Sequence, residues 1–105
     1  MTKYLNTSDE LINRITSGDS DAIIAGIQDN SPIVQLNALI YGTKAKIQNS
    51  VFVNSLKSLI GSRAVFFGVP MEKYVLAALD VLGVQNYQGD DDFVLRLIHS
   101  DFQIV

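Results

Sequence analysis

The 105-residue sequence contains no cysteine and no tryptophan, and His99 is its single histidine. Without cysteine the chain can form neither a disulfide scaffold nor a thiolate nucleophile, and one histidine cannot supply a zinc site built on a histidine pair. No apolar run approaches the ~20 residues that cross a bilayer, and the start lacks the apolar stretch of a signal peptide. We therefore expect a cytoplasmic protein with no membrane partner, no metal and no cofactor.

Charge is scarce and unevenly placed. The net charge of −3 argues against nucleic acid as a partner, because such binding depends on basic side chains that neutralise phosphates. Residues 1–29 carry a net charge of −3, residues 30–79 carry +4, and residues 80–105 carry −4. An acidic segment steers a protein toward basic partners. The length fits one domain covering residues 1–105.

Apolar residues recur at helical spacing between the glycines and prolines, which predicts an all-α chain of six or seven helices. Thr7 and Glu10 form a capping-box pattern, so the first helix is expected to begin there. Residues 51–53 and 65–69 have the composition of strands, but they lie among helical signals and are predicted as helical. The apolar tail, residues 102–105, either docks on the core or frays. The other helices are expected to start at Asp19 or Ser20, Ser31, Asn49 or Ser50, Ser62, Pro70 and Asp90–Asp92.

An internal repeat with a period near 40 residues accompanies these helices. Ala38-Leu39 recurs as Ala78-Leu79, and Phe52, Val53 and Leu56 recur as Phe93, Val94 and Leu97. Residues 29–38, Asp-Asn-Ser-Pro-Ile-Val-Gln-Leu-Asn-Ala, resemble the first helix of the HEAT-repeat family, with departures at Gln35 and Gly42. The resemblance implies a compact HEAT-like α-α superhelix. The alternative is an irregular helical bundle.

The sequence contains few of the motifs and side chains that catalysis requires. It has no phosphate-binding glycine loop, no dinucleotide fingerprint and no nucleophile elbow. On the last helix His99 shares a stripe with Asp92 and Arg96, opposite the apolar face, so we expect it to face solvent. A catalytic base needs an orienting partner and a cleft. An enzyme that uses these three side chains is therefore the least favoured hypothesis, and no catalytic residue is predicted.

Three consecutive carboxylates, Asp90, Asp91 and Asp92, precede the last helix. Calcium loops need spaced oxygens and a closing glutamate, which are missing here. Carboxylates at a helix start oppose its positive end, and that explains one or two of the three. The carboxylates beyond this need have two possible interpretations, a plain solvated helix end or an acidic contact surface. The predicted partner-binding residues are Tyr87, Asp90, Asp91, Asp92, Arg96, His99 and Asp101.

In length, helical character and general texture the chain resembles bacterial immunity proteins paired with contact-dependent growth-inhibition toxins, in particular those that neutralise an RNase A-like toxin domain. The resemblance implies an antitoxin that binds a basic toxin domain as a 1:1 heterodimer in the cytoplasm and blocks its active site. Carboxylates such as Asp90, Asp91, Asp92 and Asp101 would then stand in for RNA phosphates. The alternative function is a helical scaffold or adaptor whose partner docks against the tail.

Overall fold

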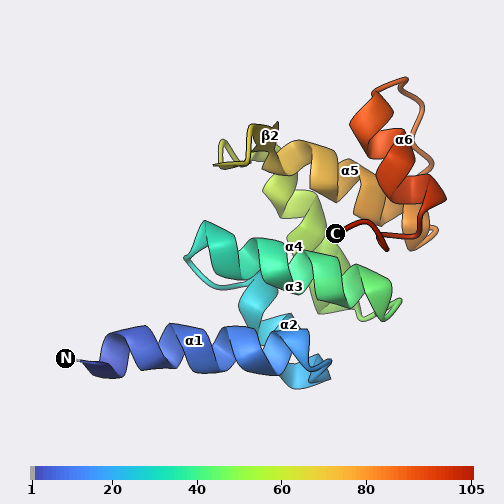
Figure 1. Cartoon of the computed structure of the whole chain (residues 1–105). Coiled ribbons are helices and arrows are strands. Elements are labelled where there is room, and N and C mark those ends of the chain that lie inside the picture. The colour runs from blue at the N-terminus through green and yellow to red at the C-terminus, as the bar shows by residue number, and fades with distance from the viewer. Residues whose placement is uncertain (1) are drawn as a thin grey trace.

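The computed structural model describes residues 2–105, with side chains from Asp9 onward. The described chain is mostly helical, as expected, but it also contains a small β-hairpin, so the all-α expectation is wrong in detail. In chain order Figure 1 shows α1 (Thr2–Thr16), α2 (Ser20–Ile27), α3 (Pro32–Lys44), α4 (Ser50–Ser58), the 3₁₀ turn η1 (Leu59–Gly61), β1 (Val65–Phe66), β2 (Val69–Pro70), α5 (Met71–Val81) and α6 (Asp92–His99).

Each helix packs on helices one or two positions away in the chain. Helix α1 contacts α3, and α3 contacts α5, so these three helices are stacked from one end of the molecule to the other (Figure 1). Helix α2 packs against α1 and α3, while α4 contacts both α2 and α5. Helix α6 packs on α5. Helices α3 and α5 therefore occupy the middle of the fold.

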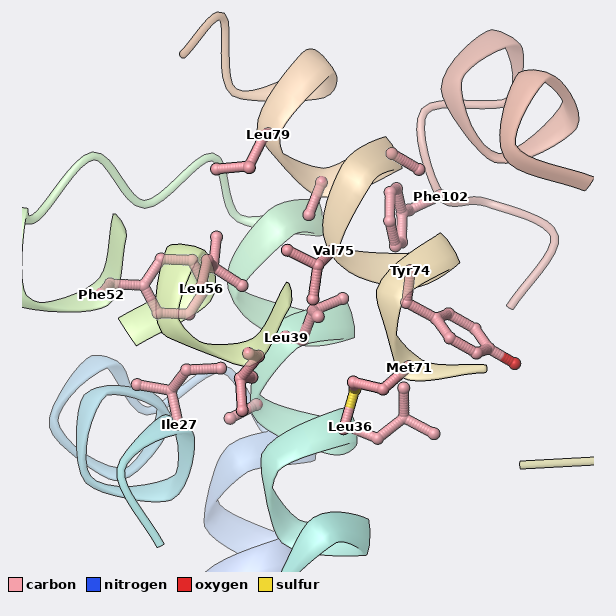
Figure 2. Close-up of a cluster of buried hydrophobic side chains, with 14 of the residues drawn as sticks. Ile27, Leu36, Leu39, Phe52, Leu56, Met71, Tyr74, Val75, Leu79 and Phe102 are labelled. Carbon is pink, nitrogen blue, oxygen red and sulfur yellow. The ribbon is translucent and has the colours of Figure 1, made fainter. Parts of the chain in front are cut away.

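The core is one cluster to which all six helices contribute, and its middle lies between α3, α4 and α5, where apolar side chains converge (Figure 2). Leu39 of α3, Phe52 and Leu56 of α4, and Val75 and Leu79 of α5 are fully buried. Burying side chains of this size contributes roughly 1.5–3 kcal/mol each to stability. The apolar positions that the helical spacing predicted are therefore buried in the core.

Side chains close several helix starts as the sequence predicted. Asp19 accepts a hydrogen bond from the Ala22 amide at 3.1 Å, and Asn49 accepts one from the Val51 amide at 2.8 Å. Ser31 differs, because its side chain makes no capping bond. There Asp29 Oδ1 instead accepts from the Ser31 amide at 2.8 Å, which is the local turn that aspartate favours.

The predicted start of the first helix is wrong. Helix α1 begins at Thr2, so Thr7 and Glu10 lie inside the helix and do not mark its beginning. The side chain of Thr7 lies outside the described residues, and Glu10 is exposed. A capping box is a local pattern, and it does not exclude a helix that extends further toward the N-terminus.

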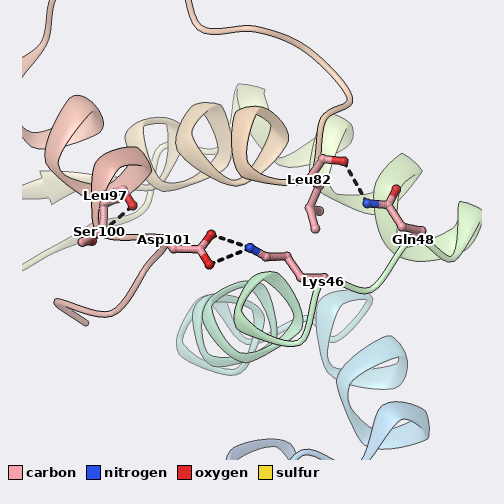
Figure 3. Close-up of polar contacts among 6 residues, drawn as sticks. All are labelled: Lys46, Gln48, Leu82, Leu97, Ser100 and Asp101. Carbon is pink, nitrogen blue, oxygen red and sulfur yellow. Dashed lines mark hydrogen bonds and ion pairs between the residues drawn. The ribbon is translucent and has the colours of Figure 1, made fainter.

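Four helices end in the same left-handed turn, in which the second residue past the cap hydrogen-bonds back to the last helical turn. Gly18 and Gly83 occupy the left-handed position after α1 and α5. After α3 and α6 the same position holds Lys46, with φ of 57°, and Asp101, with φ of 56°. These two side chains pair with each other, with 2.6 Å between Lys46 Nζ and Asp101 Oδ2 (Figure 3). The pair links the ends of two helices that are distant in sequence.

The C-terminal tail docks through one side chain. Phe102 is fully buried and is part of the core, next to α5 in Figure 2. Ile104 and Val105 remain 53% and 38% exposed. Of the two alternatives for the tail, docking therefore applies to Phe102, while the last residues stay on the surface.

The segment expected to form a short helix over residues 62–67 is instead part of a hairpin. Phe66 of β1 pairs with Val69 of β2 in antiparallel register. The two loop residues, Phe67 and Gly68, both have positive φ, 53° and 81°, as a type I′ turn requires. Gly68 adopts this backbone readily, and it sets the turn. The ring of Phe67 is 97% exposed.

The variant Phe67→Asn should raise the free energy of unfolding by about 1 kcal/mol, because asparagine tolerates the left-handed backbone and the exposed ring contributes no packing. Urea denaturation measures the difference. Phe67→Ala is the matched control, since alanine also loses the ring but keeps the backbone penalty, and it should match the parent. A destabilised Phe67→Asn protein would contradict this account of the turn.

Gly42 of α3 leaves room for the ring of Phe52 from α4. A Cβ added at this position would overlap the Phe52 ring and lie 3.0 Å from Ile23 Cγ2. A glycine at position 42 therefore has a steric reason. The Phe52 ring occupies the space that a side chain would need.

Gly42→Ala should lower the free energy of unfolding by about 2 kcal/mol even though alanine is the better helix former, because the added methyl overpacks the core. Thermal or urea unfolding tests this. The control is Gly61→Ala, where an added Cβ meets nothing within 4 Å and stability should be unchanged or slightly higher. Equal stability for both variants would show that the Gly42–Phe52 contact is relaxed.

Candidate functional site: the acidic start of α6

Asp91 is the N-terminal cap of α6, and three polar contacts hold it in place. Its Oδ1 accepts a hydrogen bond from the Val94 amide at 3.1 Å. Its Oδ2 lies 2.7 Å from Nζ of Lys73, in the first turn of α5. The Asp91 amide donates to the hydroxyl of Tyr87 at 3.2 Å. Asp91 therefore acts as an internal link between α6, α5 and the loop that connects them.

The charge of Asp91 is stabilised by these contacts. The hydrogen bond from Lys73, together with that from the Val94 amide, lowers the pKa of the Asp91 carboxyl below its usual value. A lowered pKa means that the folded state prefers the ionised form. Asp91 thus contributes to stability while both of its carboxylate oxygens are engaged within the chain.

Asp90 and Asp92 flank this anchored residue and project from it toward solvent. Asp90 is exposed. The Asp92 side chain is 87% exposed, and one of its oxygens lies 3.1 Å from Nε of Arg96 one turn later. A surface pair of this kind is weak, so the Asp92 carboxylate stays accessible. The start of α6 therefore presents two carboxylates on a backbone that Asp91 fixes.

Tyr87 organises the loop before α6. Its amide donates to Oδ2 of Asp80 at 2.8 Å, and its hydroxyl accepts from Asp91. Gly89 lies directly against this ring, because an added Cβ there would overlap the Tyr87 hydroxyl. The half-buried Tyr87 is therefore a supporting residue in this loop, with its hydroxyl turned toward the backbone of the site.

The other predicted site residues lie further along α6. Arg96 is exposed in the middle of the helix, and His99 is exposed in its last turn, as the sequence indicated. Asp101 follows the helix and pairs with Lys46. An eight-residue helix is about 12 Å long, so Asp101 does not share the acidic start with Asp90 and Asp92. The seven residues are therefore spread along α6, from the loop before its start to the turn after its end, and do not form one cluster.

Two residues next to the site were missed from the sequence, Glu72 and Lys73. Both lie in the first turn of α5, where Glu72 is exposed and Lys73 holds Asp91. Glu72 is the single acidic residue between positions 30 and 79. That isolation was the available signal, and the packing of α6 on α5 places the turn that carries Glu72 beside the start of α6.

Among residues 2–105, no helix is long and apolar enough to cross a membrane. In the same described part of the chain no group of three or more potential metal-ligating side chains is found, and no pocket is present. Comparison of the chain with protein-family models, with curated proteins and with solved structures finds no match.

Replacing Asp91 by Asn should flatten the acid side of the stability profile. Because its folded pKa is lowered, ionised Asp91 stabilises the protein above about pH 4, and this stabilisation is lost as the pH falls through the folded pKa. Asparagine keeps the capping acceptor but loses the charge. Melting temperatures between pH 2 and pH 6 measure the slope.

Lys73→Gln is the matched control for that experiment. It removes the cation and should flatten the same pH range, and the double variant should add little beyond either single change. Part of the slope remains in all of them, since the pKa of Asp19 is also lowered, by its hydrogen bonds from Ala22 and Arg14. An unchanged slope in Asp91→Asn would show that the Asp91–Lys73 pair is not formed in solution.

Proposed function

We propose that the chain is an immunity protein that binds a basic toxin domain, a ribonuclease, as a 1:1 heterodimer in the cytoplasm. The observation that carries the proposal is the pair of accessible carboxylates, Asp90 and Asp92, on a helix start fixed by Asp91. A rigid display reduces the ordering cost of binding. Acidic groups placed in this way attract a cationic surface and accelerate encounter.

Inhibition follows from the chemistry of the target. A ribonuclease binds RNA phosphates with a cationic cleft, so carboxylates at a fixed spacing can occupy the same positions. Asp90 and Asp92 are the residues that can do this, because their oxygens face solvent. Asp91 and Asp101 are less suited to mimic phosphates, because Asp91 is held by Lys73 and the Val94 amide, and Asp101 lies at the far end of α6, where it pairs with Lys46. We assign them to supporting the fold.

A HEAT-like superhelix remains our proposal for the architecture. It is supported by the stacking of α1, α3 and α5 in chain order and by the contacts of α2 with α4. The sequence repeat makes α3 with α4 and α5 with α6 the expected helix pairs; α5 packs on α6 in this way, whereas α3 packs mainly on α2. Repeats of this kind build extended surfaces for partners. A solution structure with successive helix pairs related by a constant rotation would support this architecture.

We expect a large secreted-toxin gene directly upstream of the gene for this chain, and the binding test uses the RNase A-like domain that it encodes, purified with its active site intact. The parent protein should bind it and suppress its RNase activity at equimolar concentration. The double variant Asp90→Lys/Asp92→Lys should slow association by at least about tenfold at low salt, with a smaller difference at high salt. Stopped-flow fluorescence measures the association rate.

Glu10→Lys/Asp21→Lys is the matched control. It makes the same change in net charge at exposed positions on α1 and α2, and Asp21 occupies the first turn of its helix as Asp92 does. This control should bind like the parent. If association is slowed equally in both double variants, the effect comes from net charge and not from the site at the start of α6. Failure of the parent to bind or inhibit the toxin domain would contradict the immunity function.

The competing adaptor function places a partner on the C-terminal tail. Its surface is limited to Ile104 and Val105, because Phe102 is buried in the core. A truncation after Asp101 would therefore damage the fold as well as the surface. Ile104→Ser/Val105→Ser changes only the exposed residues, and loss of partner binding in this variant, with Asp90→Lys/Asp92→Lys unaffected, would favour the adaptor function.

A further inference from the structure

We propose that Phe67 is the apolar anchor of the partner-binding surface that begins α6, and that it inserts into an apolar pocket beside the cationic face of the toxin domain. This inference rests on the proposed immunity function. It adds a second contact element, the hairpin of residues 62–70, and it defines the complementary feature that the partner must have.

The fold itself gives no reason for a phenylalanine at this position. The ring is 97% exposed, so it contributes almost nothing to the core. Its backbone is left-handed, with φ of 53°, a conformation that a bulky side chain rarely adopts. Asn-Gly is the usual sequence for such a turn. Phe67 is thus unfavourable for both solvation and backbone, and strain of this kind clusters at functional sites.

The hairpin and the acidic start of α6 are both attached to the beginning of α5. The Met71 amide donates to the Ala64 carbonyl at 2.9 Å, which fastens the hairpin to the beginning of α5. Lys73, two residues further, pairs with Asp91 at 2.7 Å. The hairpin and the start of α6 therefore both adjoin the first turn of α5, and Figure 1 shows them along the same edge of the molecule. A single partner can contact both.

Charge defines the chemistry of that partner. Glu72 is exposed on the first turn of α5, and Asp90 and Asp92 are exposed at the start of α6. The Lys73 charge is matched by Asp91. The three exposed carboxylates at the starts of α5 and α6 fit a cationic protein surface. Arg63, exposed at the base of the hairpin, would face a carboxylate on the opposite border of the pocket.

A protein pocket suits this geometry better than a lipid surface. One aromatic ring buries too little apolar area for stable membrane attachment, which takes at least two anchoring signals. A lipid surface also attracts basic residues, whereas Glu72, Asp90 and Asp92 are acidic. A rigid turn that fixes one ring is typical of an interface hot spot, where a buried aromatic residue dominates the affinity.

The test measures the Kd of the purified toxin domain for Phe67→Asn by isothermal titration calorimetry. The substitution suits the turn, so the protein remains folded, and a loss of binding reports the ring alone. We expect the Kd to rise by about 30-fold or more, mainly through faster dissociation. Phe67→Leu, which keeps an apolar side chain, should retain most of the affinity. Val51→Asn, an exposed apolar residue of α4, is the matched control and should bind like the parent.

The outcomes separate this inference from the function beneath it. If the parent binds and Phe67→Asn binds equally well, the anchor is overturned and the immunity function stands. If the parent does not bind the toxin domain, both are overturned. Sedimentation of the parent, but not of Phe67→Asn, with vesicles containing phosphatidylserine would replace the protein pocket with a lipid surface and would also overturn the inference.

Discussion

Helix α5 buries one face against α3 and α4 while Tyr74 packs edge-on against Phe93 of α6, with the ring centroids 5.4 Å apart. Both ends of the proposed binding surface depend on this packing. The hairpin enters α5 directly, and the start of α6 is fixed to its first turn through Lys73. The same helix therefore supplies the core with apolar residues and holds the two surface elements in a constant relation.

The division of work among neighbouring carboxylates follows from that constraint. Asp91 satisfies the first amides of α6 and the charge of Lys73, so it serves stability. Asp90 and Asp92, one position away on either side, have no place in that packing and face solvent. Of the three consecutive aspartates, one therefore stabilises the fold and two are exposed on the surface. Their repulsion is tolerated because the central charge is neutralised.

Much of the fold follows from local sequence signals. Gly18 and Gly83 end their helices, and Asp19 and Asn49 begin theirs, because these residues satisfy terminal backbone groups within one turn. Two features could not be predicted in this way. The hairpin has only two residues in each strand, too few for an alternating pattern, so its helical neighbours dominated the interpretation. The left-handed turn at Lys46 could not be recognised, because lysine rarely adopts this backbone conformation.

The charge pattern of the sequence identified the region of the candidate site but not which of its carboxylates are accessible. The excess of aspartate after residue 80 pointed to the start of α6, yet the sequence could not say which carboxylates are free. That distinction depends on Lys73, which is distant in sequence and reaches Asp91 only when α6 packs on α5. The role of Phe67 could not be predicted from the sequence either. An apolar residue is expected to be buried, and the exposure of Phe67 results from the tight turn in which it lies.

The central claim is that the hairpin and the start of α6 form one surface for one partner. Hydrogen-exchange mass spectrometry of the chain, free and bound to the RNase A-like toxin domain, tests it most directly. The account predicts that amides in residues 62–70 and 88–94 become protected together on binding, with residues 9–30 unchanged. Protection confined to one of the two segments, or centred on α1 and α2, would contradict it.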